Sequence, residues 1–270
     1  MHTTQSRTAL GVAAFLAMLQ RDLVVTGREF IAFLLQALMQ PLFFLFIFGK
    51  VLPGIGLAAG GFVALMLPGI VALTTLVASM QGVTLPLVLD LGFAREIDDR
   101  LLAPLPIGLV AIEKVLFAAL RGVIAGSVIF PLAWWILGAR FDVRTDHIAL
   151  LTGMIVLTAC MGASFGLVMG TVIKPEQISM MFTLIFTPLL FTGCTYYPWG
   201  ALENIRWFQI FTLFNPLTYA AEGLRYAMVP PINGRNIPTL HIGWVLPALV
   251  ASVVGSVTLG SRTFRGRVVN

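Results

Sequence analysis

Six stretches without a charged residue divide this sequence, and they constrain its fold more than any other feature. Asp, Glu, Lys and Arg are absent from 30–49, 51–89, 122–139, 147–173, 177–202 and 236–261. A helix needs about 20 residues to cross the roughly 30 Å hydrocarbon core of a bilayer, and each stretch supplies about that once 122–139 is extended back over 115–120. Backbone groups in lipid must be hydrogen-bonded within their own segment, so we predict helices.

The composition excludes an ordinary soluble domain. Hydrophobic residues make up 58% of the chain and charged residues 11%, whereas soluble domains carry about 25% charged residues. The formal net charge of +5 fits the accumulation of Lys and Arg in the cytoplasmic loops of membrane proteins. Basic runs interleaved with aromatic residues are missing, so we expect no nucleic-acid partner.

We therefore predict an all-α integral membrane protein with one six-span domain. Residues 1–28 form a cytoplasmic or interfacial helix, 29–260 the bundle, and 261–270 a cytoplasmic tail. The first short run, from Thr8 to Leu19, also resembles a signal peptide, but it is closed by Gln20, Arg21 and Asp22 rather than by a cleavage site. The predicted spans are Ile31–Phe48, Phe62–Leu87, Leu116–Leu137, Ile148–Val172, Ile178–Gly193 and Gly243–Leu259.

Charge distribution orients this bundle. Six spans place both termini on one side, and ten of the 17 Lys and Arg residues then fall on that side against six on the other. Lys and Arg favour cytoplasmic loops, so we expect a multi-pass protein with both termini in the cytoplasm. The stretch 207–221 is too short for an upright span, and Asn215-Pro216 interrupts it. We expect a re-entrant hairpin or a pair of short interfacial helices there.

The residues that could do chemistry do not form a catalytic or metal-binding pattern. The three histidines lack metal-ligand spacing, and no phosphate-binding G-x-x-x-x-G-K-[ST] motif occurs, so ATP and Mg would have to bind a partner chain. A membrane-embedded lipid-modifying enzyme remains an alternative, with Asp142, Asp146 and His147 as its one candidate cluster. An uncoupled secondary carrier is another, because Arg121 lies within a predicted span.

Small and amide side chains mark surfaces where the spans approach one another. Glycine stripes permit close backbone contact within the chain or between subunits, and Gln36, Gln40 and Gln81 either line a path or bond between helices. The stripes consist of Gly122 and Gly126 on the third span, and Gly162, Gly166 and Gly170 on the fourth.

The loop after the second span has the pattern of a short docking helix. Phe93, Ile97 and Leu101 recur every four residues and would share one face. Ala103-Pro104 ends the helix, because a residue before proline avoids the α conformation. A charged helix with an apolar stripe suits docking on a soluble partner, although a solvated loop is the alternative. The remaining residues of this predicted ATPase-coupling site are Arg95, Glu96, Asp98, Asp99 and Arg100.

Short motifs in a fixed order make the chain resemble the permease subunits of type-2 ABC exporters, with the nodulation-type and drug-export branch most similar. The loop ends in Leu101-Leu102-Ala103-Pro104-Leu105-Pro106, similar to the family's Leu-Leu-x-x-Pro element. The family's signature before the last span, G-x-x-x-x-P, N-P-L-T-Y and E-G-x-R, is matched by Gly193, Pro198, Asn215, Pro216, Glu222, Gly223 and Arg225. The family's frequent Gly-Thr after the acidic loop residues is replaced here by Asp98-Asp99-Arg100.

This resemblance implies a function. It implies a permease in the bacterial cytoplasmic (inner) membrane that pairs with a second copy or a related permease and binds two ATPase subunits. The ATP and Mg would be bound by those subunits. Few fixed charges lie in the spans, so a strongly hydrophilic ion would meet a large desolvation penalty. We therefore expect an amphipathic or lipophilic substrate, such as a drug, a lipid or a lipid-linked glycan, contacting aromatic residues and membrane lipid.

Overall fold

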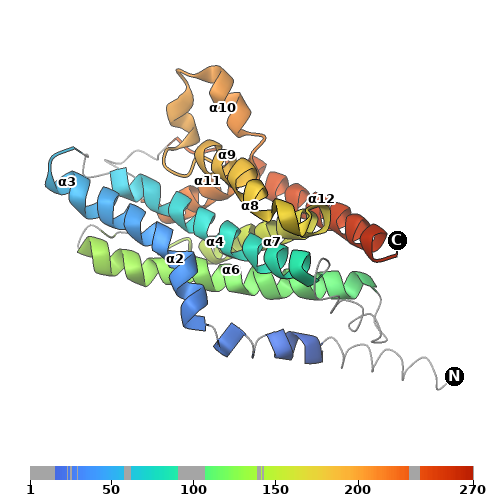
Figure 1. Cartoon of the computed structure of the whole chain (residues 1–270). Helices are drawn as coiled ribbons and strands as arrows, with labels where there is room; N and C mark the ends of the chain where they lie inside the picture. Colours follow the sequence, from blue (N-terminus) through green and yellow to red (C-terminus); the bar gives the residue numbers. More distant parts are fainter. Residues whose placement is uncertain are drawn as a thin grey trace.

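The computed structural model describes residues 16–22, 24, 26–28, 30–57, 62–90, 107–138, 141, 143–230 and 238–269. Within these residues every regular element is a helix, which confirms the predicted all-α class. The long helices lie side by side in a bundle, with α10 projecting from it (Figure 1). They are α2 (Phe30–Phe46), α4 (Phe62–Leu89), α6 (Ile107–Leu137), α7 (Ile148–Val172) and α12 (Ile242–Val269).

Five helices in the described part of the chain are long and apolar enough to cross a membrane. The first of them joins α2 to a π-helical turn at Ile47–Val51 and to α3 (Leu52–Gly54). The predicted span Ile178–Gly193 is instead a shorter helix, made of α8 (Ile178–Met181), a π-helical turn at Phe182–Phe186 and α9 (Thr187–Thr192). At 1.5 Å per residue it is about 22 Å long, short of the roughly 30 Å hydrocarbon core. The structure therefore does not confirm the count of six spans.

Two other helices extend beyond their predicted ends into charged sequence. Helix α6 begins at Ile107 rather than Leu116, and it buries Glu113 and Lys114. The Nζ atom of Lys114 lies 3.3 Å from Oδ2 of Asp22, so the helical residues 16–22 pack against the start of α6. Helix α12 continues to Val269, and its Arg267 donates hydrogen bonds to the carbonyls of Thr171 and Ile173 at the end of α7.

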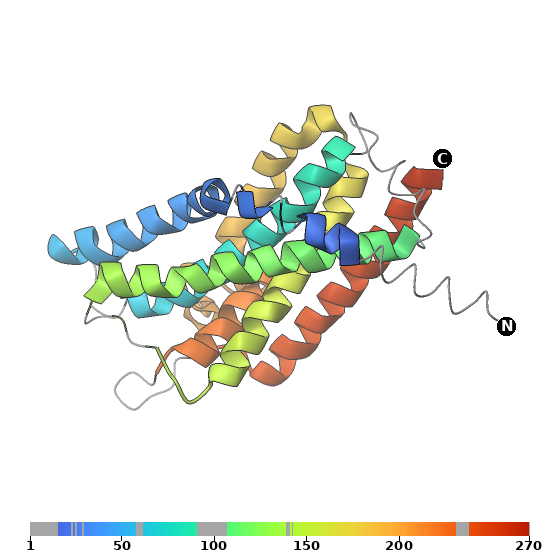
Figure 2. The same ribbon diagram turned by 90° about the horizontal axis from the view of Figure 1, so that it is seen from below.

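Helix α4 is the centre of the bundle. It packs against α2, α6, α7 and α11. Within its most apolar stretch of 18 residues, 78% of the residues are buried, whereas the buried share is 22% in the first span and 11% in α12. Helix α2 diverges from the rest of the bundle over part of its length (Figure 2). The buried hydroxyls of Thr74, Thr75 and Ser79 each donate to the carbonyl four residues earlier, so they add no unsatisfied polar group.

The glycine stripes lie where α6 and α7 meet α4. A side chain at Gly122 or Gly126 of α6 would overlap Ser79 or Thr75. The three glycines of α7 face α4 in the same way, because a Cβ at these positions would touch the residues there: Leu76 and Ser79 from Gly162, Met80 from Gly166, and Leu87 from Gly170. The absent side chains let the helix backbones approach closely, which is the packing mode expected in membranes.

This contact makes a testable prediction about stability. A Cβ at Gly166 would lie 3.0 Å from the Cα atom of Met80, in backbone that cannot move aside. We expect Gly166→Ala to destabilise the protein by about 1–3 kcal/mol through overpacking. Gly153 lies on the same helix, and a Cβ added there would meet nothing within 4 Å, so Gly153→Ala should be neutral or stabilising by up to about 1 kcal/mol. Thermal unfolding in detergent would compare them; equal melting temperatures would contradict this packing.

Candidate functional site: the buried turn before the last helix

The signature residues lie in the compact segment between α9 and α12. It contains a turn at 193–198, a 3-10 helix at Trp199–Leu202, α10 (Arg206–Thr212) and α11 (Pro216–Met228). Helix α11 is buried against α4, α7 and α12, whereas α10 exposes Trp207 and Phe211. The stretch 207–221 thus contains most of α10 and the start of the buried α11, and the structure does not confirm a re-entrant hairpin or a pair of interfacial helices.

A fully buried ion pair lies at the centre of this segment. Glu222 and Arg225 of α11 are one helical turn apart, and Nη1 of Arg225 donates to Oε1 of Glu222. The guanidinium also donates to the carbonyl of Leu65 on α4 at 3.0 Å and to the carbonyl of Cys194 at 2.9 Å. A buried charge is tolerated when paired and hydrogen-bonded in this way.

The carboxylate of Glu222 completes the network on its other side. Its Oε1 accepts the backbone N–H of Trp199 at 2.9 Å, and its Oε2 accepts the N–H of Leu240 at 3.0 Å. These two residues begin the 3-10 helix and precede α12. One ion pair therefore connects α4, α11, the turn after α9 and the approach to α12.

The turn beneath Arg225 fits directly onto α4. Cys194 adopts a left-handed backbone conformation with a φ of 49°, which is uncommon for a residue with a side chain. The carbonyl of Thr195 occupies the space that a side chain at Gly69 would need. Gly69 is thus required for the close approach, and sequence reasoning missed it because a lone glycine within a span carries no distinguishing pattern.

Asn215 joins the start of α11 to the end of α9. Its Oδ1 accepts the N–H of Leu217, and its Nδ2 donates to the carbonyl of Leu189 at 2.8 Å and to Oγ1 of Thr192 at 2.9 Å. The side chain therefore caps α11, and Pro216 occupies the first helical position, where its missing N–H costs nothing.

The other signature residues permit close packing around the ion pair. A side chain at Gly193 would overlap Leu217, and one at Gly223 would overlap Met154 of α7. Pro198 precedes the 3-10 helix, and its carbonyl accepts the N–H of Ala201. All seven signature residues thus belong to one network that holds the turn, and their hydrogen bonds are made within the chain.

The chemistry of this turn is that of a buried structural site. Burial raises the pKa of the Cys194 thiol to about 11, and the negative charge of Glu222 adds to the shift; Arg225 and hydrogen bonds to Thr212 and Thr218 lower it. At neutral pH this thiol is a poor nucleophile, since the thiolate is the reactive form. Within the described residues no group of His, Cys, Asp and Glu could hold a metal ion.

Two members of the candidate cluster for an enzyme lie close together, with Nε2 of His147 3.6 Å from Oδ2 of Asp146. The carboxylate of Asp146 accepts from Nε of Arg144 at 2.8 Å, and the ring of His147 packs edge-on against Tyr226. Asp142 lies outside the described residues. The same holds for Phe93–Leu102 and Arg95, so the predicted coupling helix is not part of the structure described here.

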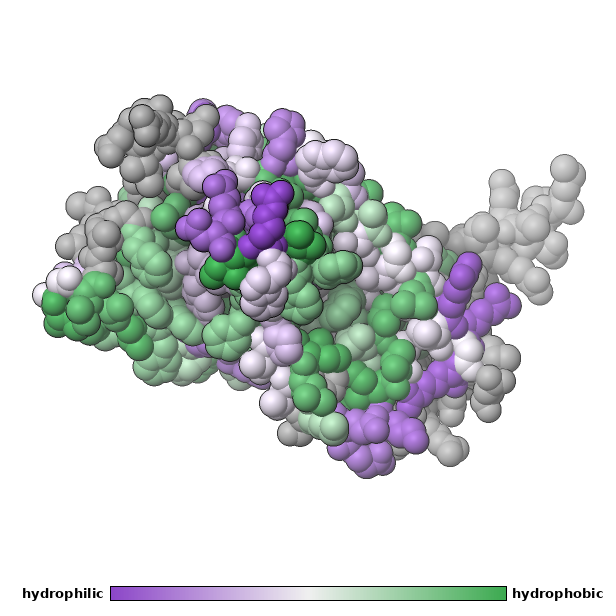
Figure 3. Space-filling view, turned by 90° about the horizontal axis from the view of Figure 1, so that it is seen from above, coloured by the Kyte–Doolittle hydropathy of each residue, from purple (hydrophilic) through white to green (hydrophobic). Residues whose placement is uncertain are grey.

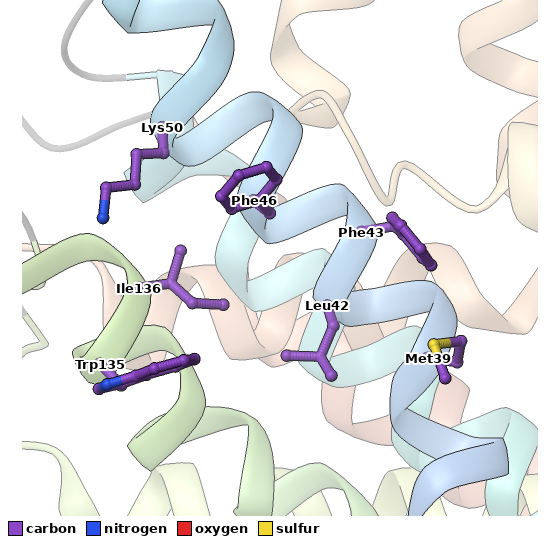
Figure 4. A pocket seen from close by; sticks show the side chains of 7 residues that line it. All are labelled: Met39, Leu42, Phe43, Phe46, Lys50, Trp135 and Ile136. Atoms are coloured by element: carbon purple, nitrogen blue, oxygen red, sulfur yellow. The ribbon is translucent and has the colours of Figure 1, made fainter.

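Three cavities lie beside α2. One of about 440 Å³ opens between α2 and α6 (Figure 4), and one of about 470 Å³ is lined by Gln36, Gln40 and neighbouring aromatic residues of the same helix. A third, of about 430 Å³, is lined by Gln36, Gln81 and Arg121. The guanidinium carbon of Arg121 lies 4.3 Å from the centre of the Phe33 ring. The amides singled out in the sequence thus border two of the cavities beside α2.

The aromatic residues divide into packed and exposed sets. Tyr196 packs on Phe44 with ring centres 5.0 Å apart, and Nε1 of Trp199 donates to the carbonyl of Gln209. Trp207, by contrast, is 73% exposed, and more than half of the surface of Phe43 and of Phe191 is exposed as well. Of the aromatics around this turn, Trp207 has the exposure that an interfacial residue needs.

The network predicts how substitution of Arg225 would act. Arg225→Met leaves Glu222 buried without its counter-charge, which should cost about 3–5 kcal/mol. The turn should then open, and in a Cys160→Ala background Cys194 should react with a maleimide at pH 8 at least about tenfold faster, because its thiol becomes solvated.

Arg144→Gln, which removes a cation from an exposed pair, is the control and should change neither quantity appreciably. Unchanged melting temperature and labelling rate in Arg225→Met would show that the ion pair does not hold the turn.

Comparison with known proteins identifies this arrangement. The family model described as ABC-2 type transporter matches residues 13–229. The inner membrane transport permease YadH of Escherichia coli K12 is 28% identical over 138 residues, which cover 51% of this chain and 52% of YadH, so the match spans about half of that relative. Nodulation protein J of Rhizobium leguminosarum bv. trifolii is 27% identical over 263 residues, or 92% of this chain and 96% of that protein. The chain therefore belongs to the ABC-2 type transporter family.

Proposed function

We propose that this permease exports an amphipathic or lipophilic substrate, using ATP hydrolysed by a separate ATPase. The observation that carries the proposal is a pair of cavities beside α2 that Gln36 borders, which are walled mainly by apolar and aromatic side chains and carry the polar groups of Gln40, Gln81 and Arg121. Binding sites of this kind suit ligands that are mainly apolar, because the few polar groups orient the ligand while the walls exclude water. Drugs, lipids and lipid-linked glycans share that character.

The ATPase would dock at the end of the bundle that carries the loop 91–106. The described part of the chain supports a route for coupling at this end. Asp22 of the N-terminal helical segment is paired with Lys114 near the start of α6. A displacement of the N-terminal segment would therefore displace the start of α6 as well, and the reverse. The docking helix predicted at 93–102 immediately precedes α6 and would transmit closure of the ATPase pair to the same place. Transport requires that ATP binding favour one permease conformation over another.

A second permease copy would cover the exposed side of α2. Phe43 and Ile47 of α2 are exposed, as are Leu184 and Phe191 of the segment 178–192. Hydrophobic residues cover a broad part of the face seen in Figure 3, with hydrophilic residues gathered in patches. Lipid covers such surfaces in a monomer, and a matching surface on a second copy would cover part of them in a dimer.

The proposed orientation has both ends of the chain in the cytoplasm of a bacterial cell, at the inner membrane. Asp22 contacts the start of α6 and Arg267 contacts the end of α7, and these two helix ends lie together because α6 and α7 are adjacent and successive. The excess of Lys and Arg at this end supports a cytoplasmic location.

Docking can be tested by co-purification of the chain with its proposed ATPase partner. Ile97→Asp with Leu101→Asp should reduce the bound ATPase about tenfold or more, because each charge would have to be desolvated at the apolar contact. The control is Ile205→Asp, at an exposed position before α10. The permease purified alone should show no ATP hydrolysis above background. Full retention of the ATPase by the double variant would reject this docking helix.

The path can be tested separately in vesicles that contain the permease with its ATPase. Gln36 is exposed and borders two of the cavities, so Gln36→Trp should fill them without disturbing the core. Export of a lipophilic dye and of a short-chain fluorescent glycolipid would be compared in wild type, and we expect whichever is transported to fall at least about fivefold in Gln36→Trp. Gly153→Ala is the control. Transport of neither probe alongside transport of a small inorganic ion would reject the proposed substrate class.

A further inference from the structure

The cavity between α2 and α6 differs from the other two because a lysine lies at one end of it. Lys50, in the π-helical turn that ends α2, is exposed and borders the cavity. Below it along α2 come Phe46, Leu42 and Met39, facing Trp135 and Ile136 of α6 (Figure 4). None of the described residues that line this cavity is acidic, so the site combines one positive charge with an apolar wall.

The helices themselves give the cavity its shape. At Gly49 the absent side chain allows α2 to touch Leu137 of α6, and Gly49 is buried in that contact. Away from this contact the cavity is bordered by exposed side chains of both helices, among them Phe46 and Trp135, so it opens toward the side of the bundle. A ligand that lies in the membrane can therefore enter laterally, between two helices that remain joined beside Lys50.

The dimensions match one leaflet of a bilayer. Lys50 and Met39 are 11 positions apart on α2, a rise of about 16 Å, which is half of the roughly 30 Å hydrocarbon core. Trp135, with 76% of its surface exposed, lies on the wall opposite, and tryptophan favours the boundary between headgroups and hydrocarbon. With Lys50 at headgroup depth, Met39 would therefore lie near the middle of the membrane.

We propose that this cavity binds an anionic phospholipid of the membrane, with its phosphate at Lys50 and one acyl chain along Phe46, Leu42 and Met39. The charge is complementary, because the lysine attracts an anionic headgroup whereas the wall offers an acyl chain only apolar contacts. The cavity shares Met39 and Phe43 with the neighbouring cavity, whose lining also includes Gln40 and Phe44. The site would hold α2 in place from the lipid side, and it requires neither ATP nor a transported substrate.

The test uses the purified full-length chain in lipid nanodiscs made of phosphatidylcholine with a minor fraction of phosphatidylglycerol carrying the same acyl chains. Native mass spectrometry after release would count the two lipids that remain bound. We expect wild type to retain phosphatidylglycerol preferentially and Lys50→Gln to lower that preference about fivefold, which corresponds to about 1 kcal/mol for one lysine near an anionic surface. Lys50→Arg should keep the preference, because it keeps the charge.

Arg206→Gln is the matched control, because it removes an exposed cation outside the cavity, at the start of α10. A second measurement locates the lipid. The difference in tryptophan emission between the wild type and Trp135→Phe gives the fluorescence of Trp135, which acyl-brominated phosphatidylglycerol should quench more than brominated phosphatidylcholine does. Lys50→Gln should abolish this difference between the two lipids. Equal retention of the two lipids by wild type, an equal loss in Arg206→Gln, or equal quenching by both lipids would overturn the proposal. Because no ATPase and no transport enter either measurement, these outcomes are independent of the proposed export function.

Discussion

The buried pair of Glu222 and Arg225 is the interaction on which the second half of the structure depends. Two charges within an apolar bundle are costly unless every polar atom finds a partner. Here Arg225 reaches the carbonyls of Leu65 and Cys194, and Glu222 accepts the N–H groups of Trp199 and Leu240. Three of those partners, Cys194, Trp199 and Leu240, are backbone groups outside the α-helices, which would otherwise be unsatisfied away from water. The ion pair therefore makes a non-helical turn compatible with burial inside a membrane protein.

Close approach to α4 explains where the chain needs glycine. The turn reaches α4 at Gly69, while α6 and α7 reach it at Gly126 and Gly162. Small side chains are needed at the contacts of a central helix that other segments approach from several sides. The hydroxyl groups of Thr74 and Thr75 donate hydrogen bonds to the backbone of α4 itself. The consequence is an uneven bundle in which α4 is largely buried whereas α2 and α12 lie at the edge.

The spans could be predicted from the sequence because lipid burial demands long uncharged helices, and their centres agree with the structure at five positions. Their ends could not. Helix α6 starts early because Lys114 is neutralised by Asp22, a contact across 92 positions that no local pattern shows. Helix α12 continues through Arg267 because that side chain finds carbonyls at the end of α7. The signature of seven residues was recognised, but its mutual contacts and the roles of Gly69, Trp199 and Leu240 depend on tertiary packing.

The division between a fixed turn and open cavities bears on where substrate selection resides. The signature side chains use their hydrogen-bonding capacity within the turn: Asn215 on Leu189, Thr192 and Leu217, and Glu222 and Arg225 on each other and the surrounding backbone. Such groups cannot bind a ligand without first losing those bonds, each of which contributes about 0.5–1.5 kcal/mol or more when charged. The side chains bordering the cavities, such as Gln36 and Phe43, are not held in that network. Under the proposed function, changes along α2 would therefore alter what the protein binds while the turn before α12 keeps the same structure.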